Sequence, residues 1–212
     1  MDISEPRAFL TALLQMGIRT YVSGRPQEMT LSDLAERVRT CARCELSRTR
    51  KTVVFGEGNE HARLVFVGEA PGEEEDLQGR PFVGRAGKLL DQMIERTGLA
   101  RRDVFICNVL KCRPPNNRDP QPQEVEACSA YLFAQLDLIK PAIICTLGRH
   151  AYNTLLGVEE RITRIRGILT EYKGITLLPT YHPSFLLRNE AAIKDAYGDM
   201  EKLKQFLQTN TV

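Results

Sequence analysis

Short apolar runs alternate with amphipathic runs along most of the chain. Four continuous apolar runs have the length of buried strands, and they span residues 64–67, 104–109, 142–147 and 175–178. Apolar residues at helical spacing predict helices over 88–97, 122–139 and 191–207, and another that Gly148 opens. Buried strands that alternate with helices are typical of a mostly parallel sheet covered on both faces. The pattern therefore predicts one α/β domain.

A helical segment is predicted in front of this domain. Apolar residues recur at helical spacing between Phe9 and Ile18, and Thr30 and Asp33 have the spacing of a capping box that opens a second helix. Acidic and basic residues balance in residues 1–40, five of each, so nothing there indicates a DNA-binding arm. We assign 1–40 to a helical N-terminal extension and 41–212 to the α/β domain.

The composition is that of an ordinary soluble globular protein, with 42% hydrophobic and 26% charged residues. No apolar run approaches the roughly 18 residues that cross a bilayer, and the N-terminus lacks the pattern of a signal peptide. We therefore expect a cytoplasmic protein without membrane association. The net charge of +2 does not by itself indicate a partner.

The stretch from Gly68 to Gly87 is the most unusual part of the chain. It contains five glycines and two prolines, and five carboxylates lie between Glu69 and Asp76. It follows the first predicted strand, and open α/β sheets bind ligands at the carboxyl ends of their strands. We expect a long loop that forms half of an active site.

Six cysteines in a cytoplasmic chain indicate metal binding or burial rather than disulfides. Cys107 and Cys145 lie inside predicted strands, where a free thiol behaves as a small apolar side chain. The remaining four form the expected ligand set: Cys41, Cys44, Cys112 and Cys128. Four thiolates suit zinc or an iron–sulfur cluster, and the wide spacing of the second pair favours [4Fe-4S].

Polar residues at the other strand ends complete the candidate site. His182 follows the fourth strand, and Asn108 ends the second, where a buried amide needs partners that a ligand base could supply. Phe82 is either a stacking surface for a base or an apolar anchor of its loop. Residues 101–118 carry five basic residues and one acidic residue, which is compatible with contact to phosphates.

Several motifs together resemble the family 4 uracil-DNA glycosylases, the iron–sulfur branch of their superfamily. The matching stretches are 68–72, 79–84, Asn108 with 111–115, 127–128 and 182–188. The resemblance covers residues 40–208, and it implies a three-layer α/β/α sandwich around a four-stranded parallel sheet. It also implies a structural [4Fe-4S] cluster on the four chosen cysteines.

The resemblance assigns roles to the residues that would surround a flipped uracil. His182 would donate to uracil O2 and stabilise the departing anion, Phe82 would stack on the base, and Asn108 would read its polar edge. Glu75 would lie near C5, where it helps to exclude the methyl group of thymine.

Further roles concern the attacking water and the DNA. Ala70, in the substrate site, occupies the place of the water-activating aspartate of the wider superfamily. Water positioning then falls to Glu69, to a backbone carbonyl or to no carboxylate at all, and we assign it to Glu69. Leu186 would enter the gap left by the flipped nucleotide, and Ser184 and Arg188 would hold flanking phosphates.

These roles predict a monomeric DNA repair enzyme that hydrolyses the N-glycosidic bond of deoxyuridine in single- or double-stranded DNA. Two alternatives remain at this point. One is a glycosylase that acts on a broader set of deaminated bases. The other is a non-enzymatic iron–sulfur module that binds DNA or senses redox state.

Overall fold

A six-stranded sheet forms the centre of the molecule. The computed structural model describes residues 29–210, so the predicted helix between Phe9 and Ile18 lies outside the described part. The strand order is β1-β3-β2-β4-β6-β5. The strands are β1 (Glu57–Gly58), β2 (Leu64–Gly68), β3 (Phe105–Asn108), β4 (Ile143–Leu147), β5 (Thr170–Tyr172) and β6 (Ile175–Thr180).

The four inner strands are the four that the sequence predicts, and they pair in parallel. The expected sheet of four strands is nevertheless wrong in number, because β1 and β5 add antiparallel edges. These edge strands have two and three residues. Runs so short carry no periodic signal, and only their pairing with a longer neighbour makes them strands.

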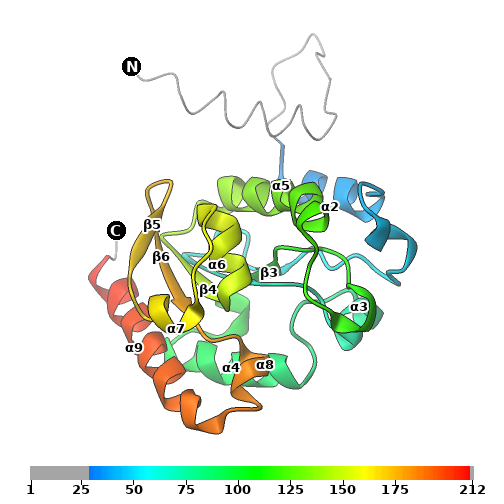
Figure 1. The fold of residues 1–212 in the computed structure, drawn as a ribbon. Helices are drawn as coiled ribbons and strands as arrows, with labels where there is room; N and C mark the ends of the chain where they lie inside the picture. Colours follow the sequence, from blue (N-terminus) through cyan, green and yellow to red (C-terminus); the bar gives the residue numbers. More distant parts are fainter. Residues whose placement is uncertain (1–28, 211–212) are drawn as a thin grey trace.

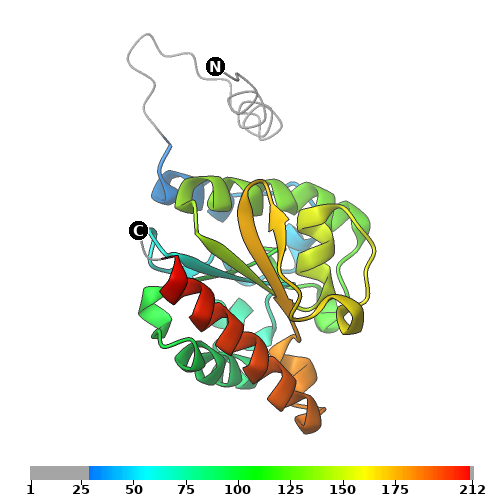
Figure 2. The ribbon, with the colours of Figure 1, turned by 90° about the vertical axis from the view of Figure 1, so that its left-hand side faces the viewer.

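Helices cover both faces of the sheet (Figures 1 and 2). One face carries α2 (Leu31–Arg39), α5 (Pro122–Ile139) and α6 (Arg149–Leu156); the other carries α4 (Arg85–Arg96), α8 (Pro183–Leu186) and α9 (Ile193–Thr209). Two short helices, α3 (Glu73–Gln78) and α7 (Ile162–Ile165), and 3₁₀ turns at 45–48, 101–103, 115–117 and 190–192 complete the described elements.

The apolar runs are continuous because both faces of the sheet are buried. In β2, Val65 and Val67 pack with α2 and α5, whereas Leu64 and Phe66 pack with α4 and α9. Side chains that alternate along a strand therefore belong to two different cores. Cys107 and Cys145 are fully buried, one in each core, as predicted.

The predicted capping box is confirmed at the start of α2. The side chain of Thr30 accepts a hydrogen bond from the backbone N–H of Asp33, and the Asp33 carboxylate accepts one from the backbone N–H of Thr30. Leu34 and Val38 of this helix are buried in the core beside α5. Part of the predicted extension thus packs directly on the α/β domain.

The expected loop from Gly68 to Gly87 contains a helix, α3, so its description as loop throughout is wrong. Gly72 caps the start of α3, and its N–H donates to the Glu75 carboxylate. Gly79 ends the helix in the left-handed region, with φ of +71°. A six-residue helix with one buried side chain, Asp76, has no apolar periodicity that a sequence could reveal.

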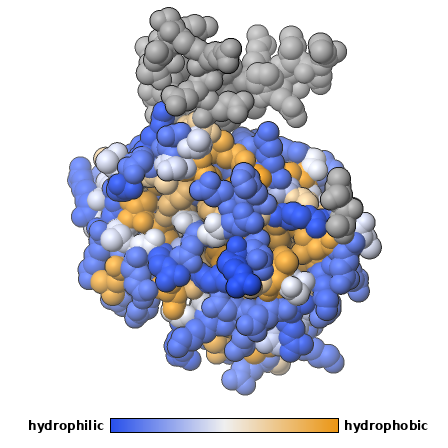
Figure 3. Space-filling model, turned by 180° about the vertical axis from the view of Figure 1, so that it is seen from behind, coloured by the Kyte–Doolittle hydropathy of each residue, from blue (hydrophilic) through white to orange (hydrophobic). Residues whose placement is uncertain are grey.

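The surface of the described part is mixed in character. In the view from behind, apolar residues form separate patches between hydrophilic ones (Figure 3). Within residues 29–210, no helix combines the length and the apolar character needed to cross a bilayer.

Candidate active site and metal centre

The parallel strands bring four polar side chains to one edge of the sheet. Glu69, Asn108, His150 and His182 lie at or just beyond the carboxyl ends of β2, β3, β4 and β6. Gly148, with φ of +87°, follows β4 and packs closely against His182, which follows β6. A Cβ at Gly148 would lie 3.2 Å from the Cβ of His182. The edge is therefore where the candidate site assembles.

Asn108 is 1% exposed, and its Oδ1 has no hydrogen-bond partner among the described residues. Gly68 lies against it. A Cβ at Gly68 would stand 2.3 Å from that Oδ1 and 2.7 Å from the ring of Phe82. Only glycine lets the amide and the ring approach the backbone this closely. A buried amide oxygen without a partner is costly, and a donor from a ligand would satisfy it.

Phe82 lies between Gly68 and His182. Its ring centroid is 5.6 Å from that of His182, and the two ring planes differ by 36°. The backbone of Phe82 is in the left-handed region, with φ of +51°, and its side chain is buried in the core beside α4. Gly87 permits this turn, because a Cβ there would lie 1.8 Å from the Phe82 carbonyl oxygen. The two roles considered for Phe82 are thus compatible: the ring is anchored and borders the site.

The hydrogen bonds of His182 determine its tautomer. Its Nδ1 accepts a hydrogen bond from the backbone N–H of Ser184 at 3.2 Å and lies 2.7 Å from the Ser184 Oγ. A nitrogen that accepts an N–H carries no proton, so a neutral ring has its proton on Nε2. Burial lowers the pKa of His182 to about 4, with smaller contributions from Arg188 and His150. At neutral pH the ring therefore presents an uncharged Nε2–H donor.

Glu69 contacts His150, which in turn contacts Asp119, and the sequence interpretation missed both of these residues. Its Oε2 lies 3.7 Å from His150 Nε2, which lies 3.3 Å from Asp119 Oδ2. Burial raises the pKa of Glu69, and His150 opposes the increase. His150 lies at the start of α6, just after β4, so its position after a predicted strand could have indicated a site residue. Asp119 lies in a loop, and only the tertiary structure brings it here.

Glu75 binds the backbone around Phe82. Its Oε1 accepts hydrogen bonds from the N–H groups of Val83 and Gly84 at 2.8 and 3.0 Å, and its Oε2 accepts one from Gly72 at 3.1 Å. The expected position near uracil C5 stays a prediction, and the three backbone donors give this carboxylate a second role. Glu75 holds the turn that carries Phe82.

The segment after β6 differs from the expectation at one residue. Leu186 is fully buried in the core beside α4, so its assignment to DNA contact is corrected, whereas Leu187 is 36% exposed. Ser184 bonds to His182, and Arg188 is exposed beyond the end of α8. Ala70 is half-buried and packs against the core near α5.

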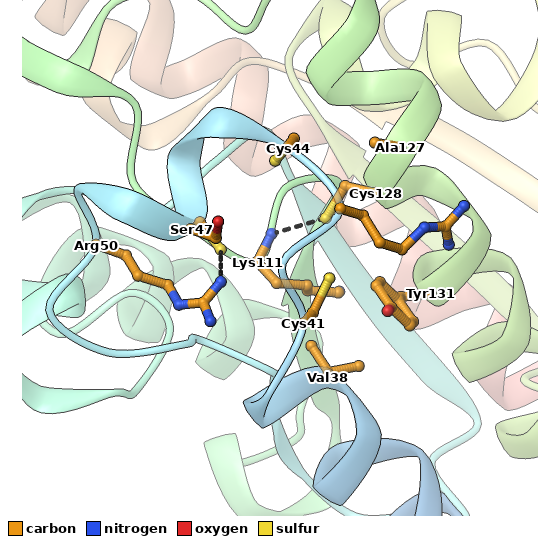
Figure 4. A pocket seen from close by; sticks show the side chains of 11 residues that line it. Val38, Cys41, Cys44, Ser47, Arg50, Lys111, Ala127, Cys128 and Tyr131 are labelled. Carbon is orange, nitrogen blue, oxygen red and sulfur yellow. Dashed lines mark hydrogen bonds between the residues drawn. The ribbon is translucent and has the colours of Figure 1, made fainter. Parts of the chain in front are cut away.

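The four predicted ligand cysteines line a single cavity (Figure 4). Cys41 and Cys44 follow α2, Cys112 follows β3, and Cys128 lies on α5. Among the described residues, Glu69, Asp119 and His150 form a group whose possible ligand atoms all lie within 4.8 Å of one another.

Hydrogen-bond donors approach the cysteine sulfurs. Arg50 Nη1 lies 3.3 Å from the Sγ of Cys112, and the backbone N of Lys111 lies 3.3 Å from the Sγ of Cys128 (Figure 4). Burial raises the pKa of Cys128 to about 12 and also raises that of Cys112. These thiols therefore become thiolates only when a positive centre compensates their charge, as metal ligation does.

Comparison with known proteins identifies the family. The family model described as the uracil DNA glycosylase superfamily matches residues 55–208. The chain belongs to the uracil DNA glycosylase superfamily. Relatives named type-4 uracil-DNA glycosylase occur in Thermotoga maritima (47% identity, 86% of this chain and 97% of the relative) and in Saccharolobus solfataricus (47%, 84% and 87%). A third, from Sulfurisphaera tokodaii, is 48% identical over 85% of this chain and 86% of its own length.

The superfamily match covers all the residues gathered at the carboxyl edge of the sheet. It also includes Cys112 and Cys128, whereas Cys41 and Cys44 precede its first residue. The cavity of the four cysteines thus combines the superfamily region with the segment that follows α2.

Proposed function

We propose that this protein is a DNA repair enzyme that hydrolyses the N-glycosidic bond of deoxyuridine in DNA, releases uracil and leaves an abasic site. Relatives that cover most of the chain carry the name type-4 uracil-DNA glycosylase. The observation that carries the proposal is the buried amide of Asn108, whose Oδ1 has no hydrogen-bond partner among the described residues and lies against Gly68, next to the ring of Phe82.

Asn108 and Phe82 account for the choice of base. The uracil edge offers the O4 acceptor and the N3–H donor, which a carboxamide matches with its own donor and acceptor. The partnerless Oδ1 of Asn108 would accept from N3–H. Cytosine presents an amine and an unprotonated N3, so the same orientation of the amide would reject it. The flipped base would stack against the ring of Phe82.

His182 would stabilise the departing base. Cleavage leaves negative charge on uracil, and a donor aimed at O2 lowers the energy of that charge. The Nε2–H of the neutral ring supplies such a donor, and Ser184 keeps the opposite nitrogen occupied. Ser184 thus orients His182, in addition to any phosphate contact.

Glu69 would position the attacking water. Ala70 cannot do so, because it has no polar side-chain atom. A carboxylate with a raised pKa is a better proton acceptor, and it also stabilises the positive charge that develops on the sugar. His150 would hold Glu69 in place through their contact.

DNA would approach along the segment after β6. We transfer the wedge role from Leu186 to the exposed Leu187, and we assign Arg188 to a flanking phosphate. A flipped base comes from either single- or double-stranded DNA, and one chain supplies all the residues named here, so we propose a monomer that acts on both.

We also propose that Cys41, Cys44, Cys112 and Cys128 hold a [4Fe-4S] cluster. Their common cavity, the wide spacing of Cys112 and Cys128 in the sequence and the donors from Arg50 and Lys111 support it. Its role would be structural, because the four cysteines come from separate segments that a shared cluster would hold together. The purified protein should be brown, whereas a zinc protein would be colourless.

The test is a glycosylase assay on oligonucleotides that contain uracil, hypoxanthine, xanthine or a thymine mismatch. We expect alkali-labile sites at uracil in single and double strands, and loss of at least 10²-fold in Asn108→Ala. Glu74→Ala, an exposed position on α3, is the control and should retain activity. Absence of strand cleavage after alkali would refute the proposal. Release of hypoxanthine would indicate a broader glycosylase, and redox-dependent DNA binding without base release would indicate a sensor.

A further inference from the structure

We propose that Arg101 is a positioning residue for Phe82, and that it sets the orientation of the ring on which the flipped base stacks. Arg101 lies in the 3₁₀ turn Arg101–Asp103 that precedes β3, outside the motifs that indicate the active site. This inference rests on the proposed function, because Phe82 matters only where a base binds.

The guanidinium of Arg101 holds the backbone on both sides of the Phe82 Cα. Its Nη2 donates to the Pro81 carbonyl oxygen at 2.5 Å, and its Nη1 donates to the Phe82 carbonyl oxygen at 3.3 Å. The planar fork of arginine suits two acceptors at once, which a lysine ammonium cannot bind with the same geometry.

Two carboxylates fix the guanidinium from the other side. Arg101 Nη1 lies 2.9 Å from Asp91 Oδ1 on α4, and Nε lies 3.4 Å from Glu57 Oε1 on β1. The Arg101 side chain is 22% exposed, so solvent screens these pairs only partly. Glu57 also binds Arg80 Nε at 2.6 Å. Arg101 therefore links the sheet edge and α4 to the turn at Phe82.

The turn at Phe82 needs such support. A residue with a side chain disfavours the left-handed backbone that Phe82 adopts, with φ of +51°. Glu75 binds the N–H groups on the C-terminal side of the turn, and Arg101 binds the carbonyl groups of the turn itself. Without Arg101, the backbone can relax toward a commoner conformation, and the ring would move away from His182.

The experiment compares Arg101→Gln with Arg39→Gln, which changes an arginine on α2 whose side chain is 67% exposed. We expect kcat/KM on uracil-containing DNA to fall about 10²-fold in Arg101→Gln and to stay unchanged in Arg39→Gln. In the Phe82→Ala background, Arg101→Gln should lower kcat/KM by less than about threefold. A residue that acts through Phe82 has nothing left to position once the ring is removed. Equal losses in both backgrounds would overturn the proposal.

A second readout does not depend on activity. The ring of Phe82 shifts the NMR signals of the nearby His182 imidazole, which is one of three histidines in the chain. Arg101→Gln should move these signals, and Arg39→Gln should not; unchanged signals in Arg101→Gln would overturn the proposal. If wild-type protein releases no uracil, the proposed function fails while this readout still decides the positioning.

Two further variants serve if Arg101→Gln does not fold. Arg101→Lys keeps the positive charge beside Asp91 and Glu57 but loses the paired carbonyl contacts, so it should move the His182 signals and lose most of the activity. Asp91→Asn keeps both carbonyl contacts and should lose less activity than Arg101→Lys. A larger loss of activity in Asp91→Asn than in Arg101→Lys would overturn the proposal, because activity would then depend on the ion pair with Asp91 and not on the hydrogen bonds to the carbonyl groups at Pro81 and Phe82.

Discussion

His182 has different surroundings at its two ring nitrogens. Nδ1 is saturated by two groups of Ser184, which leaves Nε2 as the donor. Burial lowers the pKa of this ring to about 4, so it stays neutral through the physiological range. We therefore expect a donor that is already uncharged in the resting enzyme, and His182→Ala should lower kcat by about 10²- to 10³-fold in a single-turnover assay. A loss below threefold would remove His182 from the mechanism.

The pH dependence of the rate separates Glu69 from His182. Burial raises the pKa of Glu69 above its ordinary 4.5, and in the proposed mechanism the carboxylate is the active form. The rate should therefore fall as the pH drops through a value above 4.5, whereas His182 is half-protonated only at a pH of about 4. Glu69→Gln should lower the rate by about 10²- to 10⁴-fold and abolish this acid limb. If the loss of rate at low pH persists in Glu69→Gln, the titration of another group must cause it.

The variant Gly68→Ala tests whether the base binds beside Asn108 and Phe82. In Gly68→Ala, the new Cβ would lie 2.3 Å from Asn108 Oδ1 and 2.7 Å from the Phe82 ring, so uracil excision should fall by at least about 10²-fold. Gly198→Ala on α9 is the control, since a Cβ there meets no atom within 4 Å. It should keep full activity and gain roughly 0.5 kcal/mol in stability. Normal activity in Gly68→Ala would place the base elsewhere.

The loop around α3 acts as a unit at the next scale. Asp76 is buried and accepts hydrogen bonds from the N–H groups of Lys51 and Thr52 at 2.9 and 3.3 Å, while Glu75 binds the turn at Phe82. Two of the five carboxylates in this stretch therefore hold backbone, which explains why so many acids follow one strand. Glu75 and Asp76 are neighbours on this short helix, yet they bind two different segments of the chain.

A substitution at Glu75 distinguishes its two assignments. If Glu75 holds the turn, Glu75→Ala should lower uracil excision by about tenfold or more without any gain on thymine. If it excludes the thymine methyl group, the same variant should begin to release thymine from mismatches. Glu74→Ala, exposed on the same helix, should match wild type in both assays. The measurement is the ratio of kcat/KM on uracil and thymine substrates.

At the scale of the whole molecule, the cysteine cavity joins segments that are far apart in the sequence. The end of α2, the chain after β3 and α5 meet there, and α2 also packs on α5 through buried Leu34 and Val38. A group bound to all four sulfurs would cross-link these elements. Its loss would leave buried thiols and loosen one face of the sheet, while the catalytic edge keeps its own contacts.

Removal of one ligand tests this cross-link. Cys128→Ala should yield colourless protein with a midpoint of thermal unfolding lowered by several degrees, since metal-site binding energy is also folding energy. Cys145→Ala, buried in the core on the opposite face, should stay brown. Iron content, absorbance and calorimetry measure the outcome. A brown Cys128→Ala protein would exclude Cys128 from the ligand set.

The sequence by itself determined the elements with strong periodicity. The inner strands, the span of α5, the capping box of α2 and the burial of Cys107 and Cys145 all follow from local patterns, because apolar spacing and capping chemistry depend on neighbouring residues. Strand ends also indicate Asn108 and His182, since parallel strands align their carboxyl ends.

Only the tertiary structure decided what each side chain faces. Leu186 and Leu187 are identical in type and adjacent in sequence, yet one is buried and the other exposed because α8 packs against α4. Glu75 binds backbone eight and nine residues away, and Arg101 reaches Phe82 across 19 residues. Contacts of this kind leave no local pattern, because they arise where separate elements meet in the folded chain.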